Sequence, residues 1–219
     1  MNLAHTERLA LCDLLDEVGA EAPTLCEGWE AQDLAAHLWL RETDPLATPG
    51  IVIKPLAGLT ERRMSQATTK FSHSELVDKV RRGPGRLSVF SLPGMDEAAN
   101  LAEYFVHHED VRRAQAGEVE PRRLDPAIED ALWKRLSTMG RAMFRRCESS
   151  VVARRSDADG HLVEGLEPLV LKPGEPTVTV TGTPGELLLL AFGRGRHARL
   201  AFEGAEGDVE RLLETRLGV

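Results

Sequence analysis

Apolar residues recur at intervals of three and four through the first two-thirds of the chain, the spacing that places side chains on one face of an α-helix. This pattern predicts helices over residues 2–18, 31–43, 56–69, 72–82, 96–117 and 125–147. Ser72 with Glu75, and Asp125 with Pro126, are typical helix starts. Stretches rich in proline and glycine predict loops at 48–55 and 83–94. Four long helices with one or two short ones indicate a helical bundle.

The hydrophobic pattern changes after residue 150. Residues 176–182 alternate threonine and valine with the two-residue period of a half-buried strand, and shorter strands are predicted near 151–155, 169–171 and 198–202. Helices at 184–192 and 205–217 interrupt them. The expected fold class is therefore α+β, with a helical domain over residues 1–149 and a small α+β domain over 150–219.

Composition and charge exclude several classes of protein. The 219 residues carry 27 basic and 35 acidic side chains, a net charge of −8, and only 5% are aromatic. Because nucleic acids select basic surfaces, no nucleic-acid partner is expected. The longest apolar run, residues 187–192, is far shorter than the ~20 residues of a spanning helix, and the N-terminus lacks the features of a signal peptide. We expect a cytoplasmic protein with no membrane association.

The most informative segment for chemistry lies in the helix predicted at 96–117. Glu103 and His107 are four residues apart, so both side chains can reach one point beside the helix. Asp110 lies on nearly the same face and can orient a metal-binding imidazole through a hydrogen bond. His108 points to another side of the helix. The spacing favours a two-ligand clip made by Glu103 and His107.

A third ligand is expected from a facing helix. His37 lies in the otherwise apolar helix predicted at 31–43, where an imidazole without a partner is costly. Two histidines and one carboxylate leave coordination positions open on a divalent ion, as catalysis requires. Zinc, nickel and iron all accept this set.

Simpler interpretations remain open for these residues. A Glu-x-x-x-His pair often forms a hydrogen bond on a solvated face, and a single buried histidine is most often a core residue. The run at 109–113 is typical of a salt-bridged helix surface. Arg194 fits a turn after a helix, or a contact to an anionic substrate. The three cysteines, Cys12, Cys26 and Cys147, have no disulfide spacing and are interpreted as reduced, incidental thiols.

Three segments together resemble a known family. Residues 24–29 (TLCEGW), 33–38 (DLAAHL) and 103–107 (EYFVH) followed by Asp110 resemble the metal-binding domain of mycothiol-dependent maleylpyruvate isomerases, which belong to the DinB-like superfamily of four-helix metalloproteins. Residues 178–194 are similar to the small C-terminal α+β domain of that family. The resemblance implies a DinB-like four-helix bundle followed by that small domain. The doubled His107-His108 is similar to the sequences of an actinobacterial branch of the family.

The resemblance also implies a site and a cosubstrate. The family's zinc-type ligands fall on His37, Glu103 and His107. Beside this ligand set, we expect Asp110 to orient a ligand and Arg194 to contact an anion. The expected partners are a low-molecular-weight thiol such as mycothiol and an unidentified electrophile, in a transferase or isomerase reaction. A non-catalytic metal-binding or regulatory protein, and a purely structural helical protein, are the alternatives. The sequence does not determine the oligomeric state, and a homodimer is one of the options.

Overall fold

The computed structural model describes residues 2–44, 57–83, 95–117 and 119–218. The chain divides into two units, residues 1–119 and 120–219, which are described separately. The loop expected at 48–55 lies outside the described residues, and of the one expected at 83–94 only Gly83, which ends α5, is described. Within the described part, no helix is both long and apolar enough to cross a bilayer.

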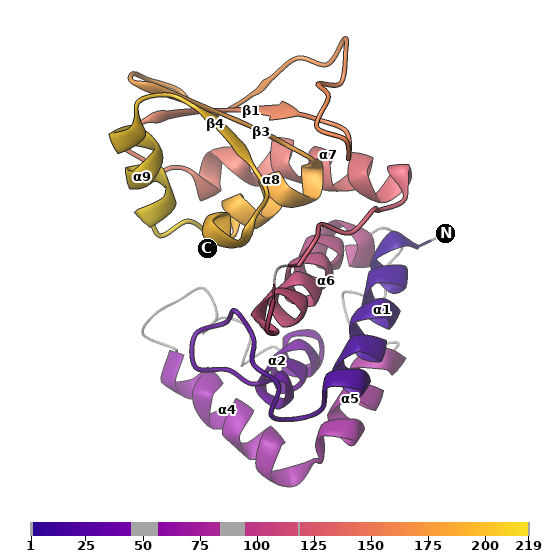
Figure 1. The fold of residues 1–219 in the computed structure, drawn as a ribbon. Coiled ribbons are helices and arrows are strands. Elements are labelled where there is room, and N and C mark those ends of the chain that lie inside the picture. Colours follow the sequence, from indigo (N-terminus) through magenta and orange to yellow (C-terminus); the bar gives the residue numbers. More distant parts are fainter. Residues whose placement is uncertain (1, 45–56, 84–94, 118, 219) are drawn as a thin grey trace. The chain divides into compact units, whose positions relative to one another are not determined.

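The first unit is helical (Figure 1). Its described helices are α1 (Leu3–Val18), α2 (Ala31–Thr43), α4 (Ala57–Lys70), α5 (His73–Arg82) and α6 (Met95–Ala114). α1 packs against α6 and α5, and α2 packs against α5 and α4. The core is mainly aliphatic, with fully buried Leu11, Leu15, Leu34, Leu38 and Leu76.

Side-chain caps fix where two of these helices begin. Asn2 Oδ1 accepts the His5 N–H at 3.1 Å, so α1 begins one residue later than the pattern predicts. Ser72 and Glu75 cap α5 reciprocally: the Glu75 carboxylate accepts the Ser72 N–H at 2.8 Å, and Ser72 Oγ accepts the Glu75 N–H at 3.3 Å. This reciprocal pairing satisfies two backbone donors that the helix leaves free.

The second unit contains α7 (Pro126–Met143) and a four-stranded sheet. The strands are β1 (Ser150–Arg155), β2 (Leu169–Lys172), β3 (Thr177–Gly182) and β4 (Ala201–Glu203), in the order β2-β1-β3-β4. β1 and β3 are parallel, with Ser150 opposite Thr177, and the two outer pairs are antiparallel. The remaining elements are α8 (Pro184–Ala191), a 3-10 helix η3 (Gly195–His197) and α9 (Glu206–Glu214).

Buried and half-buried residues alternate along β3, which shows which face of the sheet lies in the core of this unit. Val178 and Val180 are buried, whereas the threonines between them are half-buried and point to the other face. The leucines of α8, residues 187–190, are all buried. α7 and α8 lie together beside the sheet (Figure 1), and α7 contacts both α8 and β2.

The mixed α+β class agrees with the sequence analysis, but the division of the chain differs from the expected one. The boundary was expected at 149/150, after α7, whereas contacts divide the chain at 119/120 and place α7 with the sheet. The physical reason is that α7 packs on α8 and β2. Gly140 of α7 lies so close to Leu171 of β2 that a Cβ atom on residue 140 would be 2.5 Å from Leu171 Cδ2.

Candidate metal centre

One face of α6 carries three of the residues nominated from the sequence. The Glu103 and His107 side chains meet across one helical turn, with His107 Nε2 3.6 Å from Glu103 Oε2. The other ring nitrogen, His107 Nδ1, lies 3.0 Å from Asp110 Oδ2. Asp110 is fully buried and His107 nearly so. The two carboxylates therefore hold the imidazole from both of its nitrogens.

His37 reaches the same place from α2. Its ring centroid is 5.4 Å from that of His107 and 4.9 Å from that of Trp29, and its side chain is buried. One ligand atom from each of His37, Glu103 and His107 lies within 4.8 Å of the other two. The two helices thus bring together the two-histidine, one-carboxylate set.

Cys26 also belongs to this region, which the sequence analysis did not anticipate. Its Sγ lies 3.8 Å from His107 Nδ1 and donates to Asp110 Oδ2 at 3.2 Å. The interpretation of all three cysteines as incidental thiols therefore needs correction for Cys26. Its neighbours lie 81 and 84 residues further along the chain, so local spacing gives no signal. The usable signal was its place within the segment that resembles the isomerase family.

The loop holding Cys26 is tied to α6 through the backbone. The Leu25 N–H donates to the Asp110 carbonyl at 3.0 Å. Within the loop, Thr24 Oγ1 accepts the Cys26 N–H at 3.2 Å and donates to the Trp29 carbonyl at 2.8 Å. These bonds place the thiol beside the imidazole without a regular element.

Burial and neighbouring charges set the protonation of the ligands. Burial, with the nearby His107, lowers the pKa of His37 to about 3, so this imidazole is neutral at pH 7 with a lone pair available. Burial raises the pKa of Glu103, but the hydrogen bond with His107 and the charge of Arg41 outweigh it and lower that pKa to about 2. Burial lowers the pKa of His107, and contacts with Asp110, Cys26 and Glu103 reverse this and raise it well above the usual value.

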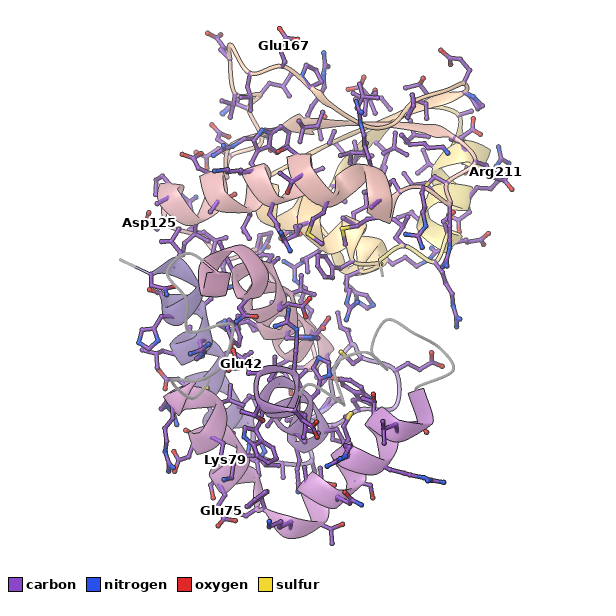
Figure 2. The ribbon with its side chains drawn as sticks, turned by 180° about the vertical axis from the view of Figure 1, so that it is seen from behind. Glu42, Glu75, Lys79, Asp125, Glu167 and Arg211 are labelled. Carbon is purple, nitrogen blue, oxygen red and sulfur yellow. The ribbon has the colours of Figure 1, made fainter. Side chains whose placement is uncertain are left out.

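A buried polar network adjoins the site on the side of Arg41. Arg41 Nε lies 3.7 Å from Glu103 Oε2, and its guanidinium also donates to Asn100 Oδ1. Asn100 Nδ2 in turn donates to Glu42 Oε1 at 3.2 Å. Glu42 carries the label near the middle of the first unit in Figure 2, and it also accepts bonds from Arg8 at 2.7 Å and from the Tyr104 hydroxyl. The network links α1, α2 and α6 around one carboxylate.

The other charged residues nominated or set aside from the sequence have partners of their own. His108 Nδ1 is 3.9 Å from Glu7 Oε2 on α1. Glu109 pairs with Arg112 and Arg113 as expected, but it is fully buried, so this run is not a solvated surface. Arg194 belongs to the second unit, where its Nη1 donates to the Phe192 carbonyl at 2.6 Å.

The three nominated ligands fit a divalent ion. Ligands held at about 2.0–2.2 Å from a tetrahedral ion lie about 3.3–3.6 Å from one another. The separation of 3.6 Å between His107 Nε2 and Glu103 Oε2 matches this distance. Asp110 on Nδ1 leaves Nε2 facing Glu103, an arrangement typical of metal-binding histidines.

Comparisons with known proteins give one structural similarity. No family model matches the chain, and no curated protein matches it in sequence. Among solved structures, the chain is similar to one described as "Crystal structure of the mycothiol-dependent maleylpyruvate isomerase", with a TM-score of 0.60 and 14% identity. The match covers 92% of this chain and 90% of that one. At this identity the similarity shows a shared fold and no more.

Proposed function

We propose that the protein binds a divalent metal ion through His37, Glu103 and His107 and uses it to activate a low-molecular-weight thiol for a transfer or isomerisation reaction. The observation that carries the proposal is the convergence of these three ligands from two helices, all within 4.8 Å of one another. Zinc is the expected ion, and nickel and iron accept the same ligands. We also propose that the helices carrying these ligands form a DinB-like four-helix bundle.

The residues divide the work of holding the ion. Neutral His37 offers a lone pair, and Glu103 supplies the negative charge that partly offsets a dication. Asp110 accepts the Nδ1 proton of His107, which directs Nε2 toward the other two ligands. Arg41 lies beside Glu103 and holds that carboxylate in its ionised form. A bound divalent ion would supply Lewis acidity and lower the pKa of a coordinated thiol.

The thiol is proposed to be a cosubstrate such as mycothiol. The structural neighbour is described as mycothiol-dependent, and the present chain shares its fold. A cytoplasmic location, where small thiols stay reduced, belongs to the same proposal. Arg194 is proposed as a contact for an anionic group of the electrophilic substrate, because arginine suits carboxylate recognition.

A thiol-dependence assay tests this function. Zinc-loaded protein is incubated with maleylpyruvate, and separately with a panel of electrophiles, in the presence and absence of mycothiol. We expect turnover or adduct formation only with both zinc and thiol, and its loss in His37→Ala. His161→Ala is the matched control, because His161 is an exposed histidine of the second unit. Zinc binding without reaction across the panel would favour a non-catalytic metal-binding protein.

A further inference from the structure

A second set of donor atoms surrounds the other nitrogen of His107. Cys26 Sγ is 3.8 Å from His107 Nδ1 and 3.2 Å from Asp110 Oδ2, and that oxygen is 3.0 Å from Nδ1. The three residues form a group of metal-ligand type distinct from the one with His37 and Glu103. The two groups share only the imidazole of His107, one nitrogen each.

These separations suit a cation as well as they suit hydrogen bonds. A tetrahedral ion with one sulfur ligand at about 2.3 Å and nitrogen and oxygen ligands at about 2.0–2.1 Å has neighbouring ligand atoms about 3.3–3.6 Å apart. The observed values of 3.0, 3.2 and 3.8 Å depart from this range by a few tenths of an ångström. Binding an ion of zinc size here therefore requires little movement of the three side chains, and the larger Cd²⁺ requires them to spread further apart.

The donor types select the ion. A thiolate is a soft ligand, whereas the group with His37 and Glu103 offers only nitrogen and oxygen. Cys26 is half-buried, whereas Asp110 is fully buried and His107 nearly so, which makes Cys26 the most accessible of the three residues. We propose that Cys26 Sγ, His107 Nδ1 and Asp110 form a second cation site, selective for a soft, thiol-binding ion such as Cd²⁺. This site does not depend on the thiol chemistry proposed above.

Sharing one ring makes the two sites compete. When an ion occupies Nδ1, it displaces the proton that Nδ1 shares with Asp110 and the thiol proton of Cys26, and both leave to solvent. The ring is then neutral and keeps its one proton on Nε2, which faces Glu103. A protonated Nε2 has no lone pair for the first site. A soft ion at the second site therefore removes one of the three ligands from the first.

Cadmium titration of the full chain tests the second site. The ultraviolet charge-transfer absorbance of a cadmium–thiolate bond is followed in the wild type, Cys26→Ser, Cys12→Ser and His37→Ala, with circular dichroism as a check of folding. We expect a saturable band in the wild type, its loss in Cys26→Ser and its retention in Cys12→Ser, since Cys12 is a buried thiol elsewhere on α1. His37→Ala should keep the band while losing zinc binding, which separates this proposal from the first.

Several results would overturn the second site. A band that survives Cys26→Ser, a folded wild type without a band, or a band lost in His37→Ala would each do so. Asp110→Asn retains the thiol and provides an independent variant if Cys26→Ser does not fold. It should weaken cadmium binding at least tenfold, and an unchanged cadmium affinity would contradict the role of Asp110.

Discussion

Replacement of Glu42 by Gln should destabilise the first unit far more than loss of an exposed carboxylate. Glu42 Oε1 accepts bonds from Arg8, Asn100 and Tyr104, and the Glu42 and Arg8 side chains are only 3% and 5% exposed. Glutamine keeps one acceptor oxygen but removes the negative charge. Arg8 then loses the carboxylate charge that lies 2.7 Å from its Nη2, while its own charge stays buried.

The expected magnitude follows from that burial. Removing one partner of a buried ion pair typically costs about 3–5 kcal/mol. The matched control is Asp78→Asn, which also removes a carboxylate near arginines, Arg81 and Arg82, but at a site where the aspartate side chain is 56% exposed. Exposed pairs contribute about 0–1 kcal/mol, so this control should change the free energy of unfolding by no more than that.

Urea unfolding followed by tryptophan fluorescence measures the difference. Two of the three tryptophans, Trp29 and Trp39, lie in the first unit and report its unfolding. Glu42→Gln should have a much lower unfolding midpoint than Asp78→Asn. Equal midpoints for the two variants would refute the conclusion that the network around Glu42 stabilises the helices carrying the metal ligands.

Three further predictions concern single side chains. Iodoacetamide should modify Cys26 first in the metal-free native chain, because burial raises the pKa of Cys12 to about 12 and that of Cys147 to about 11; peptide mass spectrometry would show this order, and early modification of either buried thiol would contradict it. Glu75→Gln should reduce stability at pH 7 but not in acid: the α5 cap lowers the Glu75 pKa below 4.5, so its contribution is present above that value and lost as pH falls through the folded pKa. Paired thermal melts across this range should converge in acid. Asp110→Asn should weaken zinc binding about 10–100-fold by isothermal titration, because its carboxylate orients a ligand imidazole, and unchanged zinc affinity would count against that role.

The local part of the site was accessible from the sequence because helical geometry is regular. Residues four apart on a helix lie one turn from each other, so the closeness of Glu103 and His107 follows from spacing alone. His37 was nominated because an imidazole in an apolar helix needs a partner, and the structure brings it beside His107. The sequence indicated that His37 comes from a helix facing the one with His107, but it did not give the distance between the two rings.

Other features depend on tertiary contacts that spacing does not encode. Cys26 meets its partners only after a loop packs on α6, and its backbone neighbour Leu25 bonds to Asp110 there. Glu109 was expected on a salt-bridged surface, yet it is fully buried while it pairs with Arg112 and Arg113. Helical periodicity identified α7 as a helix but did not reveal that it packs against α8 and β2.

The ligands of bound zinc test the central claim most directly. X-ray absorption at the zinc edge, on protein loaded with one equivalent and no added thiol, should show two imidazole nitrogens and carboxylate oxygen with no sulfur. Addition of mycothiol should add one sulfur neighbour at about 2.3 Å. A sulfur neighbour before thiol is added, or an unchanged spectrum in His37→Ala, would contradict a zinc site formed by His37, Glu103 and His107.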